Sequence, residues 1–216
     1  PPLPPPAAAG AVDKWHIAPK AITFEKEEDD DGDMVKIKLG AGSFGVVYKG
    51  KCKHADVAVK QMDIEAPADV AAFKKEVSLM FDLHHPHIVV CFGGTVLKKA
   101  VRIVTELMTT SLGKEIHVKK TTFSEPGRRL VVAHVARGLS YLHAVHVAHR
   151  DLKPDNVMRD QYGVWKLIDF GMASTKSSSQ KSTKKTGSNQ GTQGYMAPEL
   201  YTERGGNHKV DAFAFG

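Results

Sequence analysis

The most constraining feature of the sequence is a change in its hydrophobic pattern near the middle of the chain. From Met34 onward, short strand-like runs alternate with loops, whereas after Ser124 apolar residues recur at helical spacing. The five strand-like runs read VKIKL, GVVYKG, ADVAVKQM, HIVVCFGG and VRIVTELM. This order predicts an α+β protein in which a five-stranded, mostly antiparallel sheet precedes a mainly helical region.

Two segments carry the helical period. The first, ADVAAFKKEVSLMFDL, would insert one helix into the sheet region, and its apolar stripe contains Val70, Phe73, Val77 and Met80. The second begins after Ser124, a good N-cap residue ahead of Glu125 and Pro126. Its stripe contains Val131, Val135, Leu139 and Leu142. Two short strand-like runs, NVMR and VWKLIDF, follow this second helix.

Composition places few limits on function. Hydrophobic residues make up 42% of the 216-residue chain and charged residues 25%, so most of the chain is expected to fold. The net charge of +6 permits an anionic partner, but no nucleic-acid partner is predicted because much of the excess lies in one polar loop. Cys52 and Cys91 make no disulfide framework, which indicates a reducing compartment. No apolar run reaches the length of a membrane span.

Two stretches are predicted to be irregular. Residues 1–14, PPLPPPAAAGAVDK, are low in complexity and are interpreted as a linker whose PPLPP could dock in a WW or SH3 groove. The acidic stretch from Glu25 to Asp33 could be aligned with an EF-hand loop around Gly32. That alignment places Lys38 at the twelfth position, where calcium needs a bidentate carboxylate, so a solvated acidic loop is predicted instead.

A glycine-rich turn lies between the first two strand-like runs. Gly40, Gly42 and Gly45 form a G-x-G-x-x-G pattern, in which missing side chains let backbone N–H groups approach phosphates. In a dinucleotide-binding unit this pattern would open a helix, but GVVYKG follows it and is strand-like. The pattern therefore predicts a lid over a nucleotide.

A lysine and a glutamate stand out from their elements. In ADVAVK, alternation places Ala58 and Lys60 on one sheet face and Val57 and Val59 on the other. Glu76 lies beside the apolar stripe of the inserted helix. A solvated Glu76 is possible, but an ion pair between Lys60 and Glu76 explains both positions and is the preferred interpretation.

Three further motifs follow in order: HRDLKPDN at His149–Asn156, DFG at Asp169–Gly171 and GTQGYMAPE at Gly191–Glu199. With the glycine-rich turn and VAVK, they make the chain resemble a eukaryotic protein kinase of the Ser/Thr type, in the tyrosine-kinase-like group. The resemblance covers about residues 35–216 and accommodates the preceding WHIAPKAITF. It implies a bilobal kinase domain over residues 15–216, with an N-lobe over about 34–108 and a C-lobe over about 109–216.

The resemblance also implies roles for individual residues, with ATP and Mg²⁺ as cofactors and protein as substrate. The catalytic set would be Asp151, Lys153, Lys60 and Glu76. Two magnesium ions would be held by Asn156 and Asp169. ATP would be bound by Gly40, Ala41, Gly42, Ser43, Phe44, Gly45, Val47, Ala58, Lys60, Thr105, Glu106, Met108 and Met158, with Thr105 as gatekeeper and Glu106 to Met108 as hinge.

Specificity and control are expected from the segment after DFG. Lys153 and Thr192 match the pattern of Ser/Thr kinases. Arg150 precedes the catalytic Asp, and kinases with that Arg are generally ordered by a phosphate on the activation loop. The best-placed acceptors are Thr183, Thr186 and Ser188. A cytoplasmic location, or the cytosolic face of a receptor, is the corresponding expectation.

The chain stops on KVDAFAFG, which resembles the start of the central C-lobe helix of kinases. By this resemblance, Asp211 would accept hydrogen bonds from backbone N–H groups near His149 and Arg150. We expect the C-lobe to lack its C-terminal helices, and we therefore expect residues 1–216 to be weakly active. A catalytically inert kinase-like binding module is the alternative function that this truncation leaves open.

Overall fold

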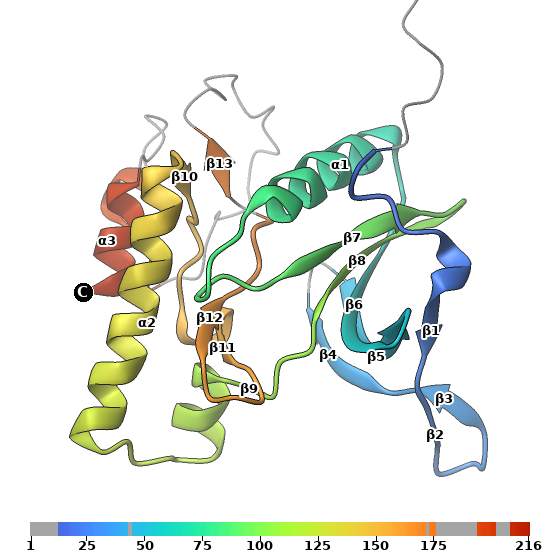
Figure 1. The fold of residues 1–216 in the computed structure, drawn as a ribbon, viewed down its shortest axis with the longest axis horizontal. Helices are drawn as coiled ribbons and strands as arrows, with labels where there is room; N and C mark the ends of the chain where they lie inside the picture. Colours follow the sequence, from blue (N-terminus) through green and yellow to red (C-terminus); the bar gives the residue numbers. More distant parts are fainter. Residues whose placement is uncertain (1–12, 43–44, 172, 176–193, 202–207) are drawn as a thin grey trace, which may run out of the picture. The chain divides into compact units, whose positions relative to one another are not determined.

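The computed structural model describes residues 13–42, 45–171, 173–175, 194–201 and 208–216. The chain divides into two compact units (Figure 1). The first unit comprises Pro1–Phe81 and Phe92–Thr105, and the second comprises Asp82–Cys91 and Glu106–Gly216. The chain therefore enters the second unit at Asp82, returns to the first unit at Phe92, and enters the second unit again at Glu106.

A twisted antiparallel sheet dominates the first unit. Its elements are η1 (Pro19–Ala21), β1 (Ile22–Phe24), β2 (Lys26–Glu28), β3 (Met34–Lys36), β4 (Lys38–Gly42), β5 (Gly45–Cys52), β6 (Ala55–Asp63), α1 (Pro67–Asp82), β7 (Cys91–Val96) and β8 (Ala100–Glu106). Six strands form the main sheet in the order β1-β5-β6-β8-β7, with β4 paired to β5. The expected sheet is thus confirmed, and β1, which the sequence pattern did not predict, extends it beyond β5.

Alternation along β6 separates the two faces of this sheet. Val57 and Val59 are fully buried, whereas Ala58 and Lys60 are half-buried on the opposite face. The core on the valine side consists of Ile22, Cys52, Val57, Val59 and Val104. Ile22 belongs to β1, so the added strand is held by the burial of its own apolar residue as well as by pairing with β5.

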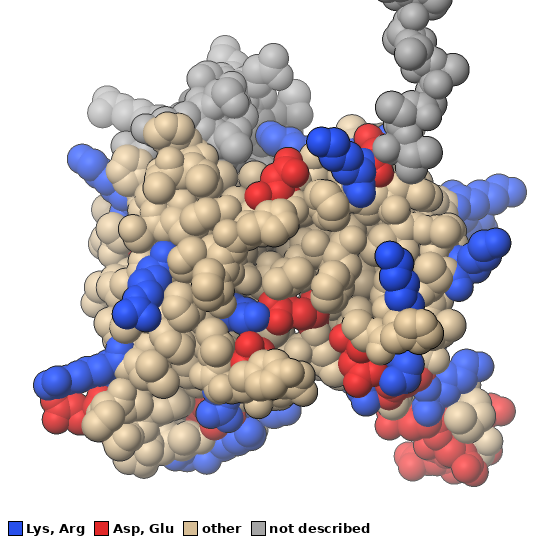
Figure 2. All heavy atoms as spheres, in the orientation of Figure 1, with Lys and Arg blue, Asp and Glu red and all other residues tan. Residues whose placement is uncertain are grey.

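The acidic stretch differs from expectation, because part of it is ordered as a strand. Lys26–Glu28 pairs with Met34–Lys36 as a β-hairpin. The Asp29 carboxylate closes the turn by accepting hydrogen bonds from the N–H groups of Asp31 and Asp33, at 3.2 and 2.8 Å. Figure 2 shows acidic side chains gathered on this hairpin. Backbone pairing and an aspartate turn thus replace the predicted irregular loop.

The second unit contains the longest helix and several short strands. Its elements are β9 (Thr110–Ser111), the π-helical turn η2 (Lys114–Val118), α2 (Glu125–Ala144), β10 (Val147–Ala148), η3 (Pro154–Asn156), β11 (Val157–Arg159), β12 (Trp165–Leu167), β13 (Ser174–Thr175), η4 (Pro198–Tyr201) and α3 (Lys209–Phe215). The short strands pair as β12-β11-β9 and β10-β13. The two predicted runs NVMR and VWKLIDF thus contain the hairpin β11-β12.

Helix α2 follows the sequence prediction closely. The Ser124 hydroxyl accepts a hydrogen bond from the Gly127 N–H at 3.3 Å, and the predicted stripe is buried. Gly138 lies where α2 approaches β12, because a Cβ atom there would stand 3.1 Å from Leu167 Cδ1 on β12 and 2.9 Å from the His87 carbonyl oxygen. No helix in the described part of the chain is both long and apolar enough to cross a bilayer.

Candidate active site

The glycine-rich turn is a hairpin between β4 and β5. Gly42 pairs with Gly45, which has a φ of +116°, and a Cβ atom on Gly45 would lie 2.2 Å from the Gln61 carbonyl oxygen. Among the described residues beyond its immediate chain neighbours, no heavy atom lies within 4 Å of an added Cβ on Gly40 or Gly42. The turn therefore needs glycine at Gly45 for its own packing, and it is open at the other two glycines. Of the remaining predicted turn residues, Ala41 is described, whereas Ser43 and Phe44 lie outside the described residues.

Lys60 and Glu76 meet within the first unit. Lys60 lies on β6 directly opposite Val47, and its Nζ stands 3.8 Å from Glu76 Oε1 on α1. Both side chains are partly shielded, at 21% and 15% exposure. The predicted pair is present, and its long separation makes it sensitive to the position of α1. Ala58 lies two residues before Lys60 on the same sheet face.

The predicted gatekeeper and hinge lie at the end of β8 and just beyond it. Thr105 and Met108 are half-buried. The Glu106 carboxylate accepts hydrogen bonds from Lys166 Nζ at 2.7 and 2.9 Å and from the Val90 N–H at 2.8 Å. This anchoring of Glu106 was not predicted. The sequence signal for this contact is the alternation along β12, which places Lys166 on the other face of the strand from the buried Trp165 and Leu167.

The second unit brings three predicted residues together around one carboxylate. Lys153 Nζ lies 2.8 Å from Asp151 Oδ2, and Asn156 Nδ2 donates to the same oxygen at 2.9 Å and to the Asp151 carbonyl at 2.8 Å. Asn156 is 5% exposed. Because Nδ2 makes both donations, the amide oxygen of Asn156 is the atom that can act as a metal ligand.

Asp169 is tied to this cluster through the backbone. The Ile168 N–H donates to the Asn156 carbonyl at 3.0 Å, and Asp169 has a φ of +62°. A left-handed conformation at a non-glycine residue is strained and is common at functional sites. The oxygens of Asn156 and Asp169 are hard ligands that suit Mg²⁺. Met158, the remaining predicted nucleotide contact, is half-buried on β11.

A buried carboxylate holds the backbone of the loop at His149–Asn156, which is called the catalytic loop below. Asp211, on α3 and fully buried, accepts from the N–H groups of His149 and Arg150 at 2.9 and 2.8 Å. Both bonds match the expectation for Asp211. His143 Nε2 adds a third contact at 2.8 Å, which sequence reasoning missed. Arg150 has a φ of +68°, and burial lowers the pKa of its guanidinium, opposed by the Asp211 carboxylate.

The His149 ring joins this loop to the segment after β12 that carries Asp169. The Asp151 N–H lies 3.3 Å from Nδ1, and Nε2 lies 2.9 Å from the Ile168 carbonyl oxygen. Since Nδ1 faces a donor and Nε2 faces an acceptor, the bonds fit a neutral imidazole protonated on Nε2. The ring is fully buried and contacts Phe170, with ring centroids 5.2 Å apart. His149 is thus a structural link and not a metal ligand.

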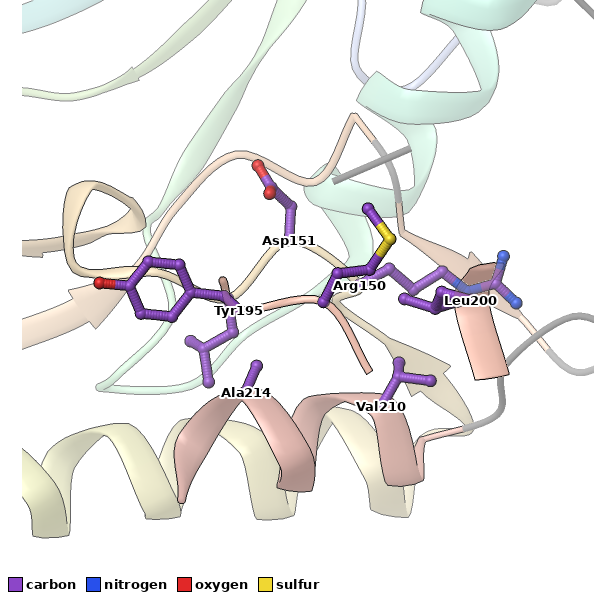
Figure 3. Close-up of a pocket in the computed structure, with 8 residues that line it drawn as sticks. Arg150, Asp151, Tyr195, Leu200, Val210 and Ala214 are labelled. Atoms are coloured by element: carbon purple, nitrogen blue, oxygen red, sulfur yellow. The ribbon is translucent and has the colours of Figure 1, made fainter. Parts of the chain in front are cut away.

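A small hollow lies beside Asp151 in the second unit. Figure 3 shows Asp151 and Tyr195 beside it, with Val210 and Ala214 on α3 below. Its other lining residues are Arg150, Leu152, Met196 and Leu200. In Figure 3 the Asp151 carboxylate points away from Val210 and Ala214 on α3. The predicted phosphoacceptors Thr183, Thr186 and Ser188, and the specificity residue Thr192, lie outside the described residues.

The motif order and the cluster around Asp151 define a class of protein. The family model described as "Protein kinase domain" matches residues 34–216. The chain belongs to this family.

Relatives in the family carry informative names. The chain is 37% identical over 203 residues to the serine/threonine-protein kinase CTR1 of Arabidopsis thaliana, covering 88% of the chain and 24% of that protein. It is 35% identical over 208 residues to the dual specificity protein kinase shkB of Dictyostelium discoideum, covering 94% and 30%. A third relative, the probable serine/threonine-protein kinase SIS8 of Arabidopsis thaliana, is 33% identical over 217 residues, covering 93% and 21%. The chain thus spans less than a third of the length of these relatives.

Proposed function

We propose that this chain is the catalytic domain of an ATP-dependent serine/threonine-protein kinase that acts in intracellular signalling. The observation that carries the proposal is the cluster of Asp151, Lys153 and Asn156, held on a braced loop by Asp211. Phosphoryl transfer needs mainly positioning and charge stabilisation, and this cluster provides a fixed carboxylate beside a fixed cation.

Within this proposal, each polar group of the cluster has one task. Asp151 orients the substrate hydroxyl and accepts its proton, while Lys153, 2.8 Å away, offsets negative charge on the transferred phosphoryl group. Asn156 and Asp169 would hold the magnesium ions through their oxygens, and the metal would supply positive charge beside the phosphates. In the first unit, Lys60 binds the α- and β-phosphates and is itself oriented by Glu76.

The nucleotide contacts are proposed from the same family pattern. Backbone N–H groups of the β4-β5 turn would bind phosphates, and Thr105 would be the gatekeeper of the adenine site. The openness at Gly40 and Gly42 supports the first assignment, since no side chain in the described part of the chain lies within 4 Å of a Cβ atom added there. The full proposed set adds Ala41, Ser43, Phe44, Gly45, Val47, Ala58, Glu106, Met108 and Met158.

The substrate class rests on Lys153 and Thr192 and on the names of the relatives, which are serine/threonine and dual specificity kinases. We propose activation by phosphorylation at Thr183, Thr186 or Ser188, read by Arg150. A reducing location, in the cytoplasm or on the cytosolic face of a receptor, is consistent with the two free cysteines. A WW or SH3 partner for PPLPP is proposed only from composition, because that segment lies outside the described residues.

A comparison of the unchanged chain with Asp151→Asn tests the activity. Phosphate transfer from radiolabelled ATP to a Ser/Thr peptide library should fall about 10²- to 10⁴-fold, because asparagine cannot accept the proton. Glu125→Gln is the matched control, since Glu125 is an exposed carboxylate on α2 that pairs with Arg129, and it should leave transfer unchanged. Equal transfer by the unchanged chain and Asp151→Asn would instead favour the inert module.

A further inference from the structure

The segment that precedes β1 packs against helix α1. The indole of Trp15 is 6% exposed and meets the ring of Phe73 edge to face, with centroids 5.5 Å apart and planes at 88°. Phe73 is itself only 2% exposed. At the same end, Asp13 Oδ2 lies 3.5 Å from Lys74 Nζ. In Figure 1 this segment, in dark blue, runs beside α1 and the end of β7.

Two adjacent glycines of β7 create the space for this packing. Gly94 donates its N–H to the Trp15 carbonyl at 2.9 Å and accepts from the Ile17 N–H at 2.8 Å. A Cβ atom on Gly93, which has a φ of +129°, would lie 2.0 Å from the Trp15 carbonyl oxygen. A Cβ atom on Gly94 would lie 2.8 Å from the Phe73 ring. The glycine pair therefore admits both the backbone of the segment and the aromatic side chain of α1.

On α1, the residue that packs against Trp15 lies next to the residue that pairs with Lys60. Phe73 precedes Glu76 by three residues, so the two side chains leave the helix as neighbours. Glu76 reaches Lys60 only at 3.8 Å, and Lys60 is fixed on the central strand β6. A displacement of α1 by about 1 Å is enough to break such a pair, and misplacement of this size can lower a catalytic rate about 10²-fold.

We propose that Trp15 is a positioning residue for Glu76: it holds α1 against the sheet so that the Lys60–Glu76 pair forms. The inference rests on the proposed kinase function, because it gives the segment a role in phosphate binding by Lys60. It also makes this segment part of the catalytic unit, although it lies before the residues matched by the family model.

Hydrogen exchange followed by mass spectrometry tests the mechanical half of the proposal without needing activity. Trp15→Ala should speed exchange of the amides of α1 roughly tenfold, while those of β5 and β6 keep their protection. Ile17→Ala is the matched control, because Ile17 lies in the same segment but packs on the core cluster of Ile22 and its neighbours. Exchange that rises equally in α1 and in the sheet would overturn the proposal, since Trp15 would then be ordinary core.

A double-mutant cycle tests the coupling to Glu76. Trp15→Ala and Glu76→Gln should each lower phosphate transfer, by up to about 10²-fold, and the double variant should be no worse than Glu76→Gln alone. Trp15→Phe, which keeps a ring against Phe73, should recover most of the rate. Fully multiplicative losses in the double variant would contradict the proposal.

The two experiments separate the possible failures. If the unchanged chain transfers no phosphate, the proposed function fails, whereas the exchange experiment still reports whether Trp15 holds α1. In that case, the affinity for Mg²⁺-ADP measured by calorimetry replaces the rate in the cycle. Additive losses of ADP affinity would overturn the coupling, and non-additive losses would support it.

Discussion

The two polar constellations of the molecule are held in different ways. In the second unit, Lys153 and Asn156 donate hydrogen bonds of 2.8 and 2.9 Å to the Asp151 carboxylate. Asp211 fixes the loop before Asp151 by accepting hydrogen bonds of 2.9 and 2.8 Å from two backbone N–H groups. In the first unit, Lys60 and Glu76 stand 3.8 Å apart on two elements. Their approach depends on how α1 packs against the sheet.

The difference indicates a division of labour. A dense hydrogen-bond network that includes the buried Asn156 and Asp211 leaves its groups little freedom, because every departure leaves a donor or acceptor unsatisfied. A long ion pair between separately packed elements is weak in itself and responds to small shifts of either element. We therefore expect the polar cluster of the second unit to be rigid and the ion pair of the first unit to be adjustable.

The largest effect should come from breaking the brace in the second unit. Asp211→Ala leaves two buried backbone N–H groups without their acceptor, which should lower the free energy of unfolding by roughly 2–6 kcal/mol. Urea denaturation followed by circular dichroism measures this loss. Asp211→Asn retains one acceptor oxygen and should lose less. A loss below about 1 kcal/mol for Asp211→Ala would remove the contrast between the two regions.

The glycine-rich turn provides the corresponding test in the first unit. Gly45→Ala forces a Cβ atom toward the Gln61 carbonyl at a φ of +116° and should reduce stability by about 1–3 kcal/mol. Gly42→Ala is the matched control, because no heavy atom of the residues that the structure describes lies within 4 Å of its added Cβ, and it should change stability by less than about 0.5 kcal/mol. Equal losses in both variants would show that the close approach of Gly45 to the Gln61 carbonyl does not stabilise this turn.

A third test uses acid to probe the second unit. Hydrogen bonds from Lys119 and then Thr121 lower the pKa of the Glu115 carboxylate from 4.5 to about 2. Because this pKa is lower in the folded state, the unfolded state binds more protons below pH 4.5. The stabilisation by Glu115 is therefore complete above that pH and is lost as the pH falls toward about 2.

Urea midpoints measured at neutral pH and at about pH 3 reveal this dependence. Glu115→Gln should flatten the acid-induced decrease, whereas the exposed Glu125→Gln should leave it as in the unchanged chain. An identical decrease in all three proteins would mean that other carboxylates control the acid response.

The smallest effect on stability should come from the ion pair of the first unit. Glu76→Gln removes the charge that faces Lys60 and should lower the free energy of unfolding by less than about 1 kcal/mol, because the two groups are 3.8 Å apart. The same urea experiment measures it. A loss as large as that of Asp211→Ala would show that the two constellations are equally rigid.

Much of the local structure was predictable because it depends on neighbouring residues. Helix α2 begins at its Ser124 cap and buries the stripe that its period predicts. The alternation around Lys60 separates the two faces of β6. Strand β1 and the hairpin β2-β3 were missed, because they are stabilised by pairing partners that local pattern does not reveal.

The candidate site also contains contacts that the sequence predicted and contacts that it did not. Motifs were enough to predict the cluster of Asp151, Lys153 and Asn156, and the resemblance was enough to assign the two backbone bonds of Asp211. The contact of His143 with Asp211 and the pairing of Lys166 with Glu106 were not predicted, because they join residues 68 and 60 positions apart and no motif includes them. The alternation of β12 sets Lys166 apart from its buried neighbours, but no local pattern identifies its partner or that of His143.

The sequence by itself determined the family, the order of the elements and the chemical groups of the site, since these depend on residue types and short spacings. Only the tertiary structure decided how firmly each group is held. It placed His143 beside Asp211, Lys166 beside Glu106, and Trp15 against α1. The physical reason is that burial and hydrogen-bond satisfaction are properties of segments brought together by the fold, and they are absent from any one segment alone.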